Sequence, residues 1–419
     1  MKNISKQKNN FLTDSQDSRL PKAALMLASA AIILSAFHFF PYENNKFTRM
    51  ANPSTIAIII GSLLLLSASS RKTYRKKIEN LLPHISVFAY LLINLLSSAF
   101  AFSFTRALSF NAKLILFFLA AYLLFNLAIS TERSLKFIFG TAITAAVIST
   151  SACLLSRFAL NIERFGFHQS PYKYATYTAP FIALSSSYLL LKTDKKQKLL
   201  AILLIIAAFI SAGSIGLPLA IIAGLTATFI LTNKKSAKKT IIITLTIGIA
   251  TVLLFNPTSK SSPFKDCSLH ELDNKNLKQR YIEWQAEINL LQKRTASGSA
   301  AECINDYRSK FYYRLPKLNT LKTFDQNGWL TVAAETGILG LFSFCWLFCH
   351  HFKTAVKNIK NNLSPKTKSY AISCLSALIA LAIANLFSSI QFNGILIVFV
   401  LIIALIKSSN RLFNEVPKC

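Results

Sequence analysis

Charged side chains are scarce in this sequence. They make up 15% of its 419 residues, whereas 53% are hydrophobic and the mean hydropathy is +0.43. Acidic residues are scarcer still, since there are 17 of them against 47 lysines and arginines, for a net charge of +30. This composition is too apolar for a soluble domain and predicts a polytopic membrane protein. Because the basic residues fall between apolar stretches, we interpret them as membrane-flanking connectors and expect no nucleic acid partner.

Several familiar motifs are also missing. The sequence has no Cys-x-x-Cys motif, no His-Glu-x-x-His motif and no internal repeat, so nothing in it suggests a metal site. The first five apolar stretches carry almost no charge in their middles, which disfavours an ion-coupled transporter. No cleavable leader is evident, because the first apolar run, from residue 23, is long enough to remain as a span.

Long apolar stretches dominate what is present. About twelve of them are long enough to cross a membrane as helices, which predicts an all-α polytopic membrane protein. The pair around Gly213 is either one broken helix or a re-entrant turn, because two glycines and a proline interrupt an apolar run there. The predicted spans are 23–40, 52–70, 84–104, 113–130, 135–157, 175–191, 197–212, 214–232, 239–255, 336–353, 369–388 and 391–407.

Lysine and arginine positions give the expected orientation. With a cytoplasmic amino terminus, 28 of the 47 basic residues fall on the cytoplasmic side, seven in short outer connectors and twelve in one long loop. This asymmetry is the positive-inside signal, and it predicts that both termini are cytoplasmic. The expected organisation is a disordered cytoplasmic tail (1–22), transmembrane helices one to nine (23–255), a large outward loop (256–335), transmembrane helices ten to twelve (336–407) and a cytoplasmic tail (408–419).

The outward loop, 256–335, is the stretch in which we expect the chemistry. Connections of this length in membrane proteins commonly carry function. It contains Cys267 and Cys303, which either form a disulfide in an oxidising compartment or remain two free thiols. In its first half, Leu277, Tyr281 and Trp284 begin an apolar helical face that continues to residue 291, with Arg280 beside it. That helix either packs on the membrane surface or lines a cavity with Arg280.

Cations interleaved with aromatic rings recur at two places. The connector 157–175 carries Arg164, His168 and Lys173 among five rings, and residues 307–314 bring Arg308 and Arg314 together with three tyrosines and a phenylalanine. Both clusters suit an aromatic belt with snorkelling cations. They equally suit a site for a glycosyl phosphate, because guanidinium groups grip phosphate oxygens and rings stack on sugars.

Three segments taken together resemble the O-antigen ligase and polymerase superfamily of bacterial membrane glycosyltransferases. The position of the large loop after span nine is also similar to that family. The segments are Arg164-Phe-Gly-Phe-His-Gln-Ser-Pro-Tyr-Lys-Tyr-Ala175, Arg280-Tyr-Ile-Glu-Trp284, and Asn327-Gly-Trp-Leu330 followed by Glu335-Thr-Gly-Ile-Leu-Gly-Leu341.

The resemblance implies a function in surface polysaccharide and lipopolysaccharide biosynthesis. Such an enzyme transfers a glycan from undecaprenyl diphosphate to an acceptor, lipid A-core or a growing glycan, on the outer face of the bacterial inner membrane. It needs neither a nucleotide sugar nor a metal or other cofactor, and its remaining partners are membrane lipids. Arginines would stabilise the charge that develops on the diphosphate, and a base would take the proton of the acceptor hydroxyl.

The sequence departs from the family at two positions. Gln326 stands where the family has a histidine base, and Ile215 stands where it has an arginine. Asp325 is the nearest carboxylate and is either the replacement base or a cap of the following helix. Glu335 matches a family glutamate and is either part of the site or a structural residue at the loop–membrane junction. These departures leave two alternatives open: a non-catalytic, flippase-like or binding protein for lipid-linked glycans, and an unrelated multi-span transporter.

The resulting candidate site has a catalytic and a substrate-binding part. The catalytic candidates are Asp325, Gln326 and Arg280, and the substrate-binding candidates are Arg164, His168, Lys173, Trp284, Arg308, Arg314, Asn327 and Glu335.

Overall fold

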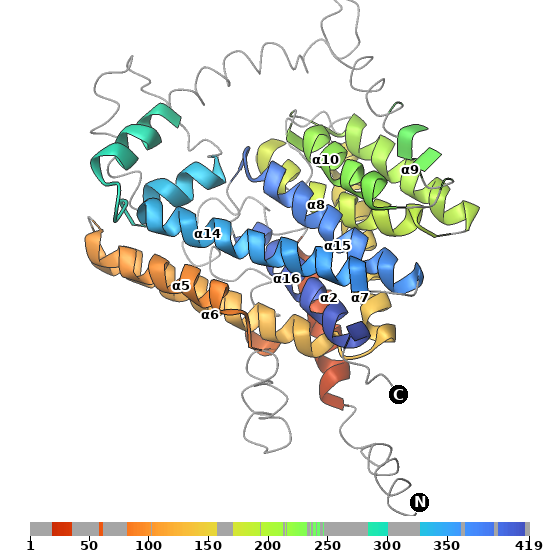
Figure 1. Cartoon of the computed structure of the whole chain (residues 1–419), viewed down its shortest axis with the longest axis horizontal. Coiled ribbons are helices and arrows are strands. Elements are labelled where there is room, and N and C mark those ends of the chain that lie inside the picture. The colour runs from red at the N-terminus through yellow and green to blue at the C-terminus, as the bar shows by residue number, and fades with distance from the viewer. Residues whose placement is uncertain are drawn as a thin grey trace, which may run out of the picture.

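The computed structural model describes sixteen separate pieces of the chain, and every structural statement below concerns these alone (Figure 1). Within them the chain forms helices and no strand, so the predicted all-α class is confirmed for this part of the molecule. The described residues are 19–35, 58–61, 82–101, 103–156, 171–192, 194–212, 214, 216–232, 235, 238–239, 241–243, 246, 284–300, 327–361, 365–388 and 393–414.

The labelled elements follow one another along the chain as helices. They are α2 (Arg19–Ser35), α5 (Ile85–Ser97), η2 (Ser98–Phe100), α6 (Phe104–Ala128), α7 (Glu132–Leu154), α8 (Pro171–Leu190), α9 (Lys195–Ile210), α10 (Gly216–Leu231), α14 (Gly328–Asn361), α15 (Pro365–Ala384) and α16 (Asn393–Asn414). An unlabelled helix covers 284–293.

Among the described residues, five helices are long and apolar enough to cross a membrane: Phe104–Ala128, Glu132–Leu154, Gly328–Asn361, Thr367–Ala384 and Ile395–Leu412. Three shorter apolar helices, Pro21–Ser35, Ile85–Phe100 and Gly216–Leu231, add to them. These helices support a membrane protein. The number of about twelve spans, the domain boundaries and the side on which the large loop lies stay predictions.

Two helices begin earlier than the hydropathy pattern predicts. α6 begins at Phe104 although its span was expected at 113, and α14 begins at Gly328 although its span was expected at 336. In α6 the polar first turns are accommodated by neighbours, because the Asn111 side chain donates to Asn94 O at 2.6 Å and to Ser98 Oγ at 2.8 Å. A hydropathy profile places an asparagine in a connector between spans. An asparagine whose amide is hydrogen-bonded can nevertheless lie inside a helix bundle.

The helix α8 lies at the centre of the described bundle, packed against α7, α9, α10 and α15 (Figure 1). All of its residues from 174 to 187 are buried, although many carry hydroxyl groups. Those hydroxyls pair across helices, as Ser187 does with Thr228 Oγ1 at 2.7 Å and with Ser376 Oγ at 2.8 Å. Small hydroxyl residues allow close approach of helices, and their hydrogen bonds join segments that apolar burial alone would not hold together in lipid.

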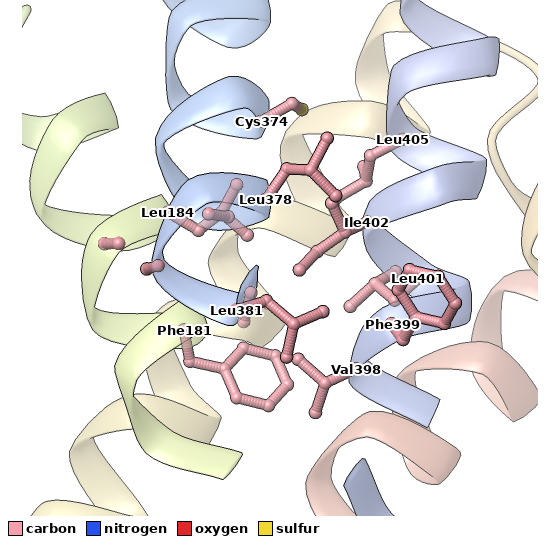
Figure 2. Packing of buried hydrophobic residues seen from close by; sticks show 14 of the residues in the cluster. Phe181, Leu184, Cys374, Leu378, Leu381, Val398, Phe399, Leu401, Ile402 and Leu405 are labelled. Atoms are coloured by element: carbon pink, nitrogen blue, oxygen red, sulfur yellow. The ribbon is translucent and has the colours of Figure 1, made fainter. Parts of the chain in front are cut away.

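Large apolar side chains fill the space between α8, α15 and α16. Phe181 and Leu184 of α8 face Leu378 and Leu381 of α15, and Phe399 lies among the α16 residues on the other side (Figure 2). Phe399 stacks on Phe348 of α14 with ring centroids 5.1 Å apart, which extends this core to a fourth helix. Dispersion between such closely packed groups is the main attraction available between helices in a bilayer.

Contacts between helix ends agree with the predicted alternation of spans. At one end of the bundle His84, just before α5, stacks on His350 of α14 with ring centroids 3.4 Å apart. At the same end Arg411 of α16 donates to Ile129 O, just after α6, at 2.6 Å. The alternation expects all four of these helix ends to be cytoplasmic. The contacts therefore support the prediction that these four helix ends lie on the same side of the membrane. That this side is the cytoplasmic one stays a prediction.

The helix α14 is interrupted at Gly337, which has φ 72° and ψ −173°. Around the break, backbone groups bond to the loop segment 295–300 instead of to their own helix. Ser299 N–H donates to Ala334 O at 2.9 Å, Ala300 N–H donates to Glu335 O at 2.7 Å, and Ile338 N–H donates to Thr295 O at 2.8 Å. The loop segment thus satisfies groups that a helix break would leave without partners.

Replacing Gly337 by alanine should lower stability. The new Cβ would lie 2.2 Å from Ala296 O, and this backbone conformation is almost restricted to glycine, so we expect a cost of about 1–3 kcal/mol. Gly140→Ala is the matched control, because an added Cβ meets nothing within 4 Å there and alanine favours a helix. Thermal unfolding of the purified protein in detergent measures both. Equal unfolding midpoints for Gly337→Ala and the native chain would contradict the requirement for glycine at position 337.

Candidate functional site

Four of the candidate site residues are described by the structure: Lys173, Trp284, Asn327 and Glu335. They lie at the start of α8, in the helix 284–293, just before α14 and inside α14. The other candidates lie outside the described residues; they are Asp325, Gln326, Arg280, Arg164, His168, Arg308, Arg314 and the cysteines Cys267 and Cys303.

Asn327 caps the amino-terminal end of α14. Its side-chain Oδ1 accepts from Trp329 N–H at 3.1 Å and from Leu330 N–H at 3.3 Å, and its backbone carbonyl accepts from Thr331 N–H at 2.8 Å. Asparagine is among the best residues for this role, because its oxygen satisfies amide groups that have no partner inside the helix. The residue that caps α14 is thus Asn327, and Asp325, two residues earlier, is not needed for this role.

The first residues of α14 rest on the end of α15. Gly328 N–H donates to Asn385 O at 2.7 Å, and the indole Nε1–H of Trp329 donates to Ala382 O at 3.1 Å. The Trp329 ring also packs on Phe344 and Phe348, each at a centroid distance of 5.0 Å. Gly328 and Trp329, the first residues of α14, are therefore fixed against the end of α15.

The start of α8 and the turn between α9 and α10 lie at the same end of the bundle. Tyr174 OH and Ser211 Oγ are 2.7 Å apart, which ties α8 to the end of α9. Thr176 Oγ1 donates to Ala384 O at 3.1 Å, which ties α8 to the end of α15. Lys173, one residue before Tyr174, is half-buried at this junction. The break predicted near Gly213 is confirmed, since α9 and α10 are separate helices.

Glu335 is buried, with 5% of its surface exposed, two residues before the break in α14. Its neighbour Ala334 packs in a small apolar cluster with Ala300, Leu290 and Ala107. This cluster joins α14 to the helix 284–293 and to α6. A carboxylate in such a setting is held by compensating groups, which favours a defined role for Glu335 at this junction.

The predicted amphipathic helix is described from Trp284 onward, and the chain is helical there over 284–293. On its predicted apolar face Ile288 is 43% exposed and Trp284 is half-buried, so this face is not covered by the described bundle and is free to lie against a membrane surface. The buried residues are Ala286, Glu287 and Leu290, and Glu287 is 1% exposed. Just after the helix, Arg294 Nη1 donates to Phe100 O at 2.8 Å, which links this segment to the end of η2. Hydrophobic periodicity expects a glutamate to face solvent and therefore misses Glu287.

Two carboxylates, Glu287 and Glu335, thus lie buried on segments that meet at one small cluster. Sequence reasoning identified only Glu335, through the family motif. The signal for Glu287 was its place between Trp284 and Leu290 at helical steps of three. Together with the capped start of α14, the two glutamates define the described part of a polar region at the end of the bundle.

The comparisons with known proteins bear on this same region. Residues 199–345 match a family model described as O-antigen ligase. The match begins in α9, passes through α10 and the predicted outward loop, and ends in α14, so it contains Asn327, Glu335 and Glu287. A search of curated proteins gave no match.

Replacing Trp329 by phenylalanine should remove one hydrogen bond and keep the aromatic packing. Because Ala382 O would lose its side-chain donor at a buried junction, we expect a loss of about 1 kcal/mol in stability. Trp346→Phe in the same helix is the control, since Trp346 is exposed and has no such bond among the described contacts. The two variants are compared by their thermal unfolding midpoints in detergent. Equal midpoints would show that the Trp329 hydrogen bond does not contribute to stability.

Proposed function

Since the chain belongs to the O-antigen ligase/polymerase family through residues 199–345, we propose that it is a membrane glycosyltransferase of surface polysaccharide assembly. In this proposal it transfers a glycan from undecaprenyl diphosphate to an acceptor hydroxyl on the outer face of the bacterial inner membrane. The observation that carries the proposal is the family match over the stretch that contains the loop and the start of α14. The acceptor is lipid A-core or a growing glycan, and both termini are cytoplasmic.

The reaction forms one bond and breaks one. The acceptor oxygen bonds to the anomeric carbon of the donor sugar while the bond from that carbon to the diphosphate oxygen breaks. Charge then builds on the diphosphate, and positioned guanidinium groups stabilise it without reorganisation. We assign this role to Arg280, with Arg164, Arg308 and Arg314 as further contacts. The acceptor proton passes to a carboxylate, and Asp325 is the candidate, since Gln326 cannot act as a base.

The described residues support this arrangement through position. Asn327 caps α14 and is held there by its hydrogen bonds, and Asp325 and Gln326 directly precede it in the sequence. Glu335 is buried next to Ala334, and Ala334 packs through a small apolar cluster on the helix 284–293, which follows Arg280 in the sequence. Helix ends in a bundle hold such groups more rigidly than a free loop would, and a fixed geometry is what transfer chemistry requires.

A non-catalytic role in handling the same lipid-linked glycan is the second candidate. Gln326 in place of the family histidine and Ile215 in place of the family arginine favour it, because both changes remove groups that the chemistry uses. A protein of this kind would bind or move the donor without breaking the sugar–phosphate bond.

Replacing Arg280 by alanine should abolish transfer while leaving the amount of protein in the membrane unchanged. We expect a loss of about 100-fold or more, because an uncompensated charge would develop on the leaving diphosphate. Asp325→Asn should reduce transfer as well, since an amide cannot take the proton. The measurement is transfer from undecaprenyl-diphosphate-linked glycan to candidate acceptors by purified protein reconstituted in vesicles.

Arg133→Ala is the matched control, since Arg133 is an exposed arginine at the start of α7. Full activity of Arg280→Ala would overturn its assignment. A native protein that binds the donor yet transfers nothing to any acceptor would instead favour the non-catalytic role.

A further inference from the structure

Three histidine rings meet where α5 begins. His84, the residue before α5, stacks on His350 of α14, with ring centroids 3.4 Å apart and ring planes 10° apart. His351 lies edge-on to His350 at a centroid distance of 5.1 Å, and the Trp346 ring lies edge-on to His84 at 6.3 Å. His84 and His350 are half-buried, whereas His351 is buried. The start of α5 therefore meets α14 through side chains that can gain a proton near neutral pH.

Hydrogen bonds show which nitrogens of these rings carry protons. Ser86 N–H donates to Nδ1 of His84 at 3.2 Å, so this nitrogen accepts and the neutral ring holds its proton on Nε2. The same bond caps the amino-terminal end of α5. Nδ1 of His351 lies 2.8 Å from Leu347 O, which can only accept, so His351 donates there. A second proton on His84 would have to bind the nitrogen that caps α5, and the cap would be lost.

The two helices that carry the stacked rings offer an added proton no compensating charge. α5 itself contains no charged residue. On α14, His351 and Lys353 interact electrostatically with the stacked rings. The acidic residue of α14, Glu335, lies before the helix break, several turns from His350. A proton gained by either stacked ring would thus lie beside groups that are neutral or positive.

Two further helices face the same rings. From α16, Lys407 interacts electrostatically with His84 and His351, and its ammonium group donates to Leu82 O, two residues before His84. From α6, the centroid of the Tyr122 ring lies 5.6 Å from that ammonium group. Within the residues that the structure describes, every charged group that acts on His84 or His350 is therefore basic. Added protons at this place meet repulsion.

We infer that the stacked pair His84–His350 is a pH-sensitive contact between α5 and α14, which holds while both rings are neutral and loosens as they take up protons. A proton on His84 removes the cap of α5, and protons on both rings place two positive charges at stacking distance. In an unfolded chain, histidine takes up its proton at about pH 6.5 without such a loss. Lower pH therefore favours opening of this contact. Because this end of the bundle is predicted to be cytoplasmic, the contact would respond to the pH inside the cell.

The first test compares thermal unfolding of the full chain in detergent at about pH 7.5 and about pH 5.5, on either side of the ordinary histidine value. The double variant His84→Asn with His350→Phe keeps a helix cap and a stacked ring, but neither new side chain titrates in this range. On lowering the pH, we expect the native midpoint to fall by about 2 °C or more beyond that of the double variant. His270→Asn is the matched control, because it removes a histidine of the predicted outward loop and should behave as the native chain does.

Amide hydrogen exchange distinguishes opening of the contact from titration of the rings alone. After correction for the intrinsic pH dependence of exchange, amides at the start of α5 in the native chain should exchange about threefold faster or more at the lower pH. In the double variant their exchange should not change with pH. The start of α9 is the internal reference, because its cap is the side chain of Asp194 and contains no histidine.

Either of two results would overturn the inference. Equal pH dependence of the midpoint in the native chain and the double variant would show that the pair does not link protons to stability. Unchanged exchange at the start of α5 in the native chain would show that the contact stays closed at the lower pH. If the double variant does not fold, the single variant His84→Asn, which keeps a cap, serves for both comparisons. Neither measurement involves glycan transfer, so this inference and the proposed function fail separately.

Discussion

Backbone groups at helix ends are the constraint on which the described structure depends. Inside a bilayer no water can satisfy the first amides or the last carbonyls of a helix, so each of them must find a partner within the protein. Here the partners are other helix ends. The start of α14 donates to the end of α15, the end of α15 also accepts from α8, and the break in α14 is completed by the loop segment 295–300. Satisfying the backbone thus also fixes the start of α14, next to the candidate residue Asn327.

The central helix α8 shows a second consequence of the same solvent. A helix that is buried on every side in water would be expected to be apolar all round. α8 instead carries hydroxyls, which pair with Ser149, Ser211, Thr228 and Ser376 on its neighbours. In lipid there is little apolar driving force between helices, so these directional bonds and close packing define how the neighbours sit. The bundle is consequently specified by its polar residues as much as by its apolar ones.

Hydropathy predicted the helical class well, and the family resemblance agrees with the family match over residues 199–345. The breaks and the buried charges were harder. Asn111 reads as a connector residue but lies inside α6, because its amide is satisfied by Asn94 and Ser98. Glu287 reads as a solvent-facing residue but is buried, on a helix whose Leu290 packs with Ala107, Ala300 and Ala334. In both cases the partners are distant in sequence, and hydrophobic periodicity takes no account of them.

The contact between Gly328 and Asn385 could not be predicted either. Nothing in the sequence links an asparagine at the end of one apolar stretch to a glycine 57 positions earlier; the link exists only because α14 and α15 meet there. Gly328 in turn reads as part of a family motif, and only the close approach of the Asn385 amide explains why that position holds glycine.

Two hydrogen bonds that flank residues 301–326 have a topological consequence. Ala300 N–H donates to Glu335 O and Gly328 N–H donates to Asn385 O, so the described residues on both sides of this stretch are attached to the same helical bundle. A single proteolytic cut between Ala300 and Gly328 would therefore leave two fragments, and each would still be hydrogen-bonded to the bundle at its own end.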